Sequence, residues 1–281
     1  MKEGDILMTA KNKFELKEVP ETLLLPLWGR AFESQKENPF VFDAKAIEIV
    51  SKIDYDFSVF EEKLGEYHAL SWSIKTKTID EAIEDFINRY PKATVVHMGC
   101  GLDTTFDRVD NGEIMWYDLD LPDVIDFRKK IVPETERRKY ISKSIFDYSW
   151  FDEIHFSKEN NILFMAAGVL IYFEEEELKP LFCKLADNFP GGEMFFDTVS
   201  QKGLESCNDV VREVGMKNDM ILWAIDSAQE IAKWHDNIKV IDEYTYYMKA
   251  PRRKDWDKEL IETMDMVDRD KLSSFYHLRF V

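Results

Sequence analysis

The sequence has few of the residues that mark several classes of protein. Its three cysteines, Cys100, Cys183 and Cys207, are an odd number without metal-ligand spacing, so they predict neither a disulfide framework nor a metal site. No apolar run reaches about 18 residues, and no secretory signal is evident. We therefore expect a soluble, cytoplasmic protein with reduced thiols and no bound metal.

Basic residues are also scarce relative to acidic ones. The chain has 37 Lys and Arg against 55 Asp and Glu, a formal net charge of −18. Nucleic-acid binders need a basic footprint to neutralise phosphates, so neither DNA nor RNA is an expected substrate. Nothing in the composition indicates a membrane partner or fixes the oligomeric state.

What the chain does contain is enough apolar residues, 45% of 281, to bury a full core. Residues 1–90 are predicted to be a helical cap or lid, and residues 91–281 an α/β core. Within the cap, Asp43–Ile53 has a helical apolar stripe with Asp43 as N-cap, and Ile79–Phe86 predicts a helix that Pro91 ends. Thr22–Phe32 contains a proline and a glycine, which favours a broken helix or loop.

Beyond residue 91, strands and helices alternate, which is typical of a doubly wound, mostly parallel sheet. A helix is predicted at Glu174–Phe189 and a helical region at Ser206–Trp234. The predicted strands are 94–98, 113–119, 139–145, 161–170, 193–199, 238–248 and 273–281.

The first two strands frame a candidate cofactor site. The buried strand Thr94–Met98 stops at Gly99-Cys100-Gly101, where glycines allow close approach of a ligand. Some twenty residues on, the second strand ends at Asp120, whose carboxylate is placed to accept hydrogen bonds from ribose hydroxyls. Dinucleotide sites have a third glycine where this chain has Thr104, so a pyrophosphate is disfavoured. Gly99-x-Gly101-x-Asp103 instead resembles the first motif of class I methyltransferases that use S-adenosylmethionine.

Four blocks together resemble the leucine carboxyl methyltransferase family, particularly its bacterial branch with polyketide O-methyltransferases. They are TLLLPLWGRA at 22–31, MGCGLDTTFDR at 98–108, WYDLDLPDVIDFRK at 116–129 and AAGVLIYFEEEE at 166–177. The resemblance implies a Rossmann-like fold with a mostly parallel seven-stranded sheet, helices on both faces, an N-terminal helical cap and residues 273–281 as an antiparallel edge strand. It also implies S-adenosylmethionine as the methyl donor.

The resemblance further implies residue roles. Gly99, Gly101 and Asp103 would form the turn under the methionine part, and Asp120 would bind the ribose. Asp118, one pleat back, should matter less.

Three positions depart from the family pattern. Lys75 stands where an arginine holds the cofactor carboxylate, and Ser144-Ile145 where Asp-Leu lies near the adenine. Ala167 replaces a glutamate, so we expect Ala167→Glu to tighten binding.

The predicted function is therefore O-methylation of a carboxylate or hydroxyl on a small molecule. Because the sulfonium is already activated, alignment can supply much of the acceleration, and no catalytic residue is assigned. His68, His97 and Tyr172 are candidate bases, though His97 and Tyr172 also fit as packing residues. Two alternatives stay open: a nucleotide-dependent oxidoreductase on a Rossmann fold, and a binding protein without turnover.

Three further residues have two interpretations each. Cys100 could be a nucleophile or a small filler between glycines. Arg252 and Arg253 could attract an acidic substrate or form a solvated basic pair.

Overall fold

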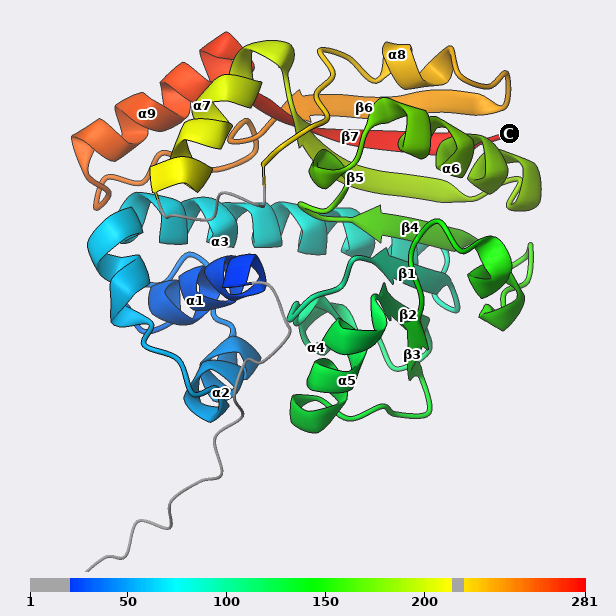
Figure 1. Cartoon of the computed structure of the whole chain (residues 1–281), viewed down its shortest axis with the longest axis horizontal. Helices are drawn as coiled ribbons and strands as arrows, with labels where there is room; N and C mark the ends of the chain where they lie inside the picture. The colour runs from blue at the N-terminus through cyan, green and yellow to red at the C-terminus, as the bar shows by residue number, and fades with distance from the viewer. Residues whose placement is uncertain (1–20, 214–219) are drawn as a thin grey trace, which may run out of the picture.

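The computed structural model describes residues 21–213 and 220–281, which form one seven-stranded sheet with helices around it (Figure 1). The strands are β1 (Thr94–Met98), β2 (Met115–Asp120), β3 (Arg138–Ser142), β4 (Ile162–Ala166), β5 (Glu193–Val199), β6 (Ile238–Thr245) and β7 (Ser273–Phe280). The helices are α1 (Leu24–Glu33), α2 (Ala44–Lys52), α3 (Ser58–Arg89), α4 (Thr105–Val109), α5 (Pro122–Ile131), α6 (Glu175–Asn188), α7 (Gln201–Glu213), α8 (Gln229–Ala232) and α9 (Lys258–Asp270). Short 3₁₀ turns η1 (Glu21–Leu23), η2 (Tyr148–Glu153) and η3 (Leu170–Tyr172) complete the set.

The strand order is β3-β2-β1-β4-β5-β7-β6, and the first five strands are parallel. β7 runs antiparallel to both β5 and β6. This confirms the predicted Rossmann-like α/β fold and the antiparallel direction of the last strand. The prediction that this strand lies at the edge is wrong, because β7 is inserted between β5 and β6 and leaves β6 at the edge.

Two predicted strands agree with the structure residue for residue, and others end earlier. β1 and β5 have the predicted bounds and are buried throughout. The apolar run that predicted a strand to Leu170 ends as β4 at Ala166, because Gly168 has φ +67° and turns the chain into η3. β3 likewise ends at Ser142, ahead of the predicted Ile145.

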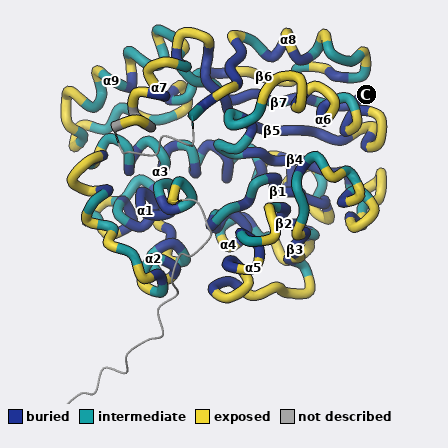
Figure 2. Tube along the Cα trace, viewed as in Figure 1, coloured by how far each residue is buried: buried dark blue, intermediate teal, exposed yellow. Residues whose placement is uncertain are grey.

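Alternating side chains of the strands divide the core into two layers. The central strands between these layers are the buried, dark part of the trace in Figure 2. On one face, β-strand residues pack against α6, with Leu178, Leu181 and Phe182 fully buried. On the other face, they pack against the second half of α3, with Ile83 and Phe86 fully buried.

The cap helices α1 and α2 pack beside the first half of α3, away from the strands (Figure 1). Asp43 caps α2, as predicted: its side chain accepts a hydrogen bond from the Ala46 N–H. The prediction of a broken helix or loop at Thr22–Phe32 is wrong, because α1 is one regular helix. Pro26 lies in its first turn, where a backbone N–H has no helical partner to lose.

α3 connects the cap to the sheet, and it contains the helix predicted at Ile79–Phe86. Its backbone is kinked at Gly65, which has φ +63°. The turns before the kink contribute Phe60 and Leu64 to the cap core, and the second half lies on the sheet. The predicted boundary between cap and core, at residue 90, therefore falls at the end of a helix that belongs to both parts. The division of the chain into these two parts stays a prediction.

The predicted helical region Ser206–Trp234 is only partly helical. Its residues 214–219 lie outside the described part of the chain. Residues 220–228 connect α7 to α8 without forming a helix, and Ile225 donates its N–H to the Val199 carbonyl at the end of β5. An extended segment here satisfies backbone groups that a helix would leave unpaired beside the strand.

Across residues 21–213 and 220–281, no helix combines the length and apolar character that crossing a bilayer requires.

Candidate active site

The glycine turn after β1 is bonded to the carboxylate at the end of β2. The Gly101 N–H donates to Asp120 Oδ2 at 2.7 Å, and the Gly99 N–H donates to the Leu119 carbonyl at 2.8 Å. Both glycines have positive φ, +65° at Gly99 and +46° at Gly101. A Cβ on Gly99 would also lie 2.3 Å from Val169 Cγ2. The structure therefore brings Gly99, Gly101 and Asp120 together, and only glycine fits at the first of them.

Asp120 is half-buried where β2 ends, at the carboxyl edge of the parallel strands. Its other oxygen, Oδ1, accepts the Leu121 N–H at 2.8 Å. Burial raises the pKa of Asp120, and this effect outweighs the two backbone hydrogen bonds, which by themselves would lower the pKa. Each oxygen keeps a lone pair for a further donor, so the carboxylate can accept from a ligand hydroxyl.

Asp103 follows the turn and is held by the N-terminal cap. Its carboxylate accepts the Thr105 N–H at 2.7 Å and lies 3.7 Å from Arg30 Nη1 of α1. Loss of hydration would raise the pKa of Asp103, but Arg30, His97 and Arg108 outweigh it and hold the pKa well below its usual range. Asp103 is therefore ionised and fixed to α1.

Two buried arginines that we did not predict hold the turn from behind. Arg128 of α5 donates to the carbonyls of Gly101 and Asp103, each at 2.7 Å, and Arg30 donates to the Leu102 carbonyl at 3.3 Å. Three successive carbonyls of the turn thus accept hydrogen bonds from guanidinium groups. The sequence carried a signal for Arg128, since it follows Val124 and Ile125 at helical spacing on the buried face of α5.

Asp118, by contrast, lies in the core. It is fully buried and accepts from Arg128 at 3.1 Å, Arg138 at 2.7 Å and the Trp116 indole at 2.8 Å. Burial would raise the pKa of Asp118, but the two arginines lower it. Asp118 is therefore a structural ion-pair partner, and its replacement would disturb the core as well as any ligand site.

Lys75 and Ala167 lie at the carboxyl ends of β4 and β5. Lys75 Nζ donates to Asp197 Oδ2 at 3.1 Å, and a Cβ on Gly168 would lie only 2.7 Å from that nitrogen. Ala167 packs with the α3-side core, beside Ile79. The structure places Lys75 within reach of the backbone that follows β4, and it adds Asp197, which the sequence did not single out.

Ser144 and Ile145 lie in the loop after β3, next to the carboxyl edge. Ser144 Oγ accepts the Phe146 N–H at 3.2 Å, so the hydroxyl already caps its own loop. The Ile145 side chain is buried in the core, which leaves only its backbone to face a ligand. Phe146, the next residue, makes an edge contact with Phe173 from the loop after η3.

The candidate bases differ in their surroundings. His97 is fully buried, with its Nδ1 unbonded 3.7 Å from Asp118, and burial lowers its pKa to about 4. His68 Nδ1 lies 2.8 Å from the Leu64 carbonyl within α3. Tyr172 ends η3, close in sequence to Val169 at the glycine turn. His97 is thus a neutral core residue and an unsuitable base.

The remaining candidates are committed to structural contacts. Cys100 is buried against Ile125 and Tyr140, and burial raises its pKa well above the usual value, so it is a packing residue. Arg252 forms ion pairs with Asp265 and Asp268, and Arg253 pairs with Asp255. Both guanidinium groups are thus neutralised by neighbouring carboxylates. This pairing disfavours both interpretations, attraction of an acidic substrate and a solvated basic pair. The described residues include no cluster of three or more His, Cys, Asp or Glu able to hold a metal.

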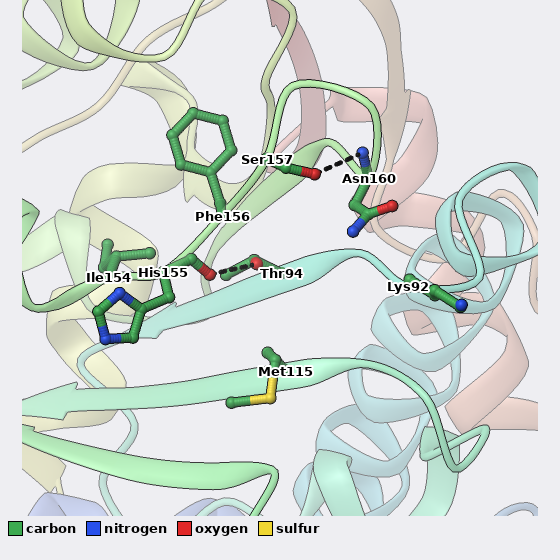
Figure 3. A pocket seen from close by; sticks show the side chains of 8 residues that line it. All are labelled: Lys92, Thr94, Met115, Ile154, His155, Phe156, Ser157 and Asn160. Carbon is green, nitrogen blue, oxygen red and sulfur yellow. Dashed lines mark hydrogen bonds between the residues drawn. The ribbon is translucent and has the colours of Figure 1, made fainter.

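A hollow of about 340 Å³ lies at the amino ends of the parallel strands, opposite the glycine turn (Figure 3). Thr94 and Met115, the first residues of β1 and β2, form part of its wall, and Thr94 donates to the His155 carbonyl at 3.0 Å. Ligands of open α/β sheets bind at the carboxyl ends of the strands, so this hollow at the amino ends is not the cofactor site. Its lining residues are Lys92, Thr94, Met115, Ile154, His155, Phe156, Ser157 and Asn160.

The sheet order and the glycine turn bonded to Asp120 define a class I, Rossmann-like methyltransferase fold. A protein of Thermobifida fusca solved as a candidate methyltransferase superposes with a TM-score of 0.59 at 14% identity, over 90% of this chain and 94% of that one. A DUF574 family protein from Streptomyces avermitilis gives 0.57 at 10% identity, over 90% and 97%. These likenesses support the fold alone.

The family follows from sequence comparison. Residues 24–186 match the family model for leucine carboxyl methyltransferase, and the chain belongs to this family of methyltransferases. The tetracenomycin polyketide synthesis O-methyltransferase TcmP of Streptomyces glaucescens is 31% identical over 64% of this chain and 66% of its own length, just under two thirds. The S-adenosyl-L-methionine-dependent methyltransferase dpfgK of Gibberella zeae is 26% identical over 83% of this chain and 86% of its own. The predicted family is confirmed, and the oxidoreductase alternative is set aside.

Proposed function

We propose that this methyltransferase transfers the methyl group of S-adenosylmethionine to an oxygen, carboxylate or hydroxyl, of a small molecule. The observation that carries the proposal is the Gly101–Asp120 hydrogen bond. It joins a turn that only glycine can form to a carboxylate at the strand end, where a nucleoside ribose would lie. The family membership and the two relatives named above support the donor and the methyl-transfer chemistry.

The residues present fit a cofactor that has a nucleoside at one end and an amino acid at the other. Gly99, Gly101 and Asp103 would form the turn under the methionine part, and Asp120 would accept from the ribose hydroxyls. Ser144 and the backbone of Ile145 would border the adenine. Lys75 carries the positive charge that the amino-acid carboxylate requires, and Ala167 directly precedes Gly168, over which the Lys75 amine lies.

An oxygen acceptor matches what the protein offers. Bound S-adenosylmethionine supplies an activated methyl group, so the protein has to align the acceptor and exclude water. A carboxylate acceptor is ionised at neutral pH and requires no base, whereas a phenol gains from one. Support for a small molecule comes from TcmP and from the net charge of −18, which disfavours a nucleic-acid substrate.

The test is methyl transfer from S-adenosylmethionine with a labelled methyl group to metabolites extracted from the producing cells. A carboxyl ester should release labelled methanol in mild alkali, and a methyl ether should not. Either product supports O-methylation and identifies the class of acceptor. Label on nitrogen, carbon or macromolecules would contradict the proposal. Tight cofactor binding without any transfer across acidic and phenolic acceptors would favour a binding protein without turnover.

A further inference from the structure

The negative charge that faces Lys75 comes from β5. The resemblance in sequence drew attention to Ala167, directly after β4, where a carboxylate is absent. The space beside Ala167, bounded by Ile79, Phe195 and Phe275, is too small to admit a water molecule. Ala167 is therefore packed against apolar groups, and Asp197 is the one carboxylate that also lines this space.

Asp197 supplies that carboxylate from the adjoining strand. Ala166 pairs with Phe196 in the β4–β5 register, so Ala167 and Asp197 are the next residues along the two strands. They share the α3 side of the sheet, as Phe195 does, while Ala166 and Phe196 face the other layer. Asp197 is buried, with 6% of its surface exposed.

The two oxygens of Asp197 have different partners. Oδ1 accepts the Gly168 N–H at 2.7 Å, and Oδ2 accepts from Lys75 Nζ at 3.1 Å. Lys75 reaches over Gly168 so closely that a Cβ there would lie 2.7 Å from its amine, which explains a glycine with φ +67°. The cation and the anion therefore lie together over the backbone that follows β4.

This charge pair is next to the cofactor turn. Val169 follows Gly168 directly, and its side chain occupies the space beside Gly99 that a Cβ would need. The two consecutive residues Gly168 and Val169 thus join the Lys75–Asp197 pair to the glycine turn. An amino-acid group bound over that turn would present one carboxylate and one ammonium to it, which are the charges that Lys75 and Asp197 complement.

We propose that Asp197 binds the α-ammonium group of the methionine part of S-adenosylmethionine, while Lys75 binds its α-carboxylate. Two opposite charges at a shielded site then bind the two charged groups of the zwitterion. The protein carboxylate that binds the ammonium is on β5 instead of at residue 167. The inference rests on S-adenosylmethionine as the donor in the proposed function, but not on the identity of the acceptor.

The inference is tested by calorimetric titration with three ligands that share the 5′-methylthioadenosine part. S-adenosylmethionine has the carboxylate, the ammonium and the sulfonium, decarboxylated S-adenosylmethionine keeps the ammonium and the sulfonium, and 5′-methylthioadenosine has none of the three charges. Asp197→Asn retains the acceptor for Gly168 but removes the charge. It should weaken the first two ligands about 10- to 100-fold and change 5′-methylthioadenosine less than about threefold. Lys75→Met should weaken only S-adenosylmethionine by a similar factor.

Two further variants act as controls. Asp242→Asn removes an exposed carboxylate of β6 and should leave all three affinities unchanged. Asp197→Ala combined with Ala167→Glu moves the carboxylate to residue 167, into space that the shortened residue 197 vacates. The double variant should recover at least about tenfold of the affinity that Asp197→Ala alone loses. Ala167→Glu with Asp197 intact places two carboxylates side by side and should not tighten binding, contrary to the expectation from sequence.

Equal losses for 5′-methylthioadenosine and S-adenosylmethionine in Asp197→Asn would mean that Asp197 only supports the fold, and would overturn the inference. Unchanged affinity for S-adenosylmethionine in that variant would overturn it too, while the proposed function would stand. A wild-type protein that binds none of the three ligands would overturn both.

Discussion

Two aspartates on β2, two residues apart, have different roles because their neighbours differ. Asp118 is enclosed by Arg128 and Arg138 and holds the core together. Asp120, at the strand end, is bonded only to backbone N–H groups and keeps capacity for a ligand. The sequence shows two equivalent carboxylates, and burial and ion pairing distinguish them.

Replacing Asp120 should therefore affect ligand binding more than folding. Asp120→Ala is expected to weaken S-adenosylmethionine by about 1.5–3 kcal/mol, the usual value of hydrogen bonds to a charged group. Calorimetric titration measures the change. Asp126→Ala, at an exposed position on α5, is the control and should not alter affinity. Unaltered affinity in Asp120→Ala would contradict the assignment of the ribose site.

His97 should make folding stability depend on pH. Burial lowers the pKa of His97 to about 4, against the attraction of Asp103 and Asp118 and together with repulsion from Arg128 and Arg138. The unfolded chain binds a proton near pH 6.5, so acidification favours unfolding between about pH 6.5 and 4. From pH 7.5 to 5 the free energy of unfolding should fall by about 2 kcal/mol through this residue.

Urea unfolding at the two pH values measures that loss. His97→Phe preserves an aromatic ring beside Trp116 and should show a smaller fall between pH 7.5 and 5, by about the same 2 kcal/mol. An identical fall in both proteins would mean that folding does not lower the pKa of His97.

At the scale of elements, the cap depends on how closely α1 approaches α3. Gly29 lies in the middle of α1, where glycine costs about 1 kcal/mol relative to alanine. A Cβ there would lie 2.7 Å from Trp72 Cε3 and 3.2 Å from the Ala69 Cα. The glycine is therefore explained by helix packing, and it does not break the helix.

Gly29→Ala should accordingly destabilise the protein, by about 1–3 kcal/mol, since overpacking outweighs the gain in helix propensity. Chemical unfolding measures the change. Combining it with Trp72→Leu should make the alanine less costly than it is beside the tryptophan. A more stable Gly29→Ala protein would show that α1 and α3 can move apart at little cost.

At the scale of the whole molecule, one buried glutamate joins α3 to the last strands. Glu193 begins β5 and is bonded to Arg89 of α3 at 2.7 Å, and to His277 at 2.9 Å and Arg279 at 2.5 Å on β7. Burial would raise the pKa of Glu193, but Arg89, His277 and Arg279 hold it well below its usual range. Its contribution to stability is present above the unfolded pKa near 4 and is lost as pH falls below that value.

Glu193→Gln should lower the free energy of unfolding by about 2–4 kcal/mol at neutral pH, because Arg89 and Arg279 lose their buried anion. Chemical denaturation measures this loss. The affinity for S-adenosylmethionine of the folded variant should not change, because Glu193 lies at the amino end of β5, opposite the cofactor edge. A variant with normal stability and weak binding would contradict this assignment.

The sequence by itself determined the succession of strands and helices along the chain, the glycine turn after β1 and the position of Asp120 at the end of β2. Each of these depends on neighbours in the chain. Apolar periodicity gives β1 and β5 to the residue, and positive φ at Gly99 and Gly101 is a local property. The prediction of a broken helix at Thr22–Phe32 failed because it treated Pro26 and Gly29 as helix breakers. Pro26 lies in the first turn of α1, where proline is tolerated, and Gly29 allows the close approach of Trp72 from α3.

Only the tertiary structure decided which charges meet at the carboxyl ends of the strands. Asp197 and Lys75 are 122 positions apart in the chain, and pairing between β4 and β5 brings them over Gly168. Arg30 and Arg128 reach the same turn from different helices. Burial and ion pairing are sums over such non-local neighbours, so they separate Asp120 from Asp118 and place a carboxylate beside Lys75 on β5, as our proposal requires.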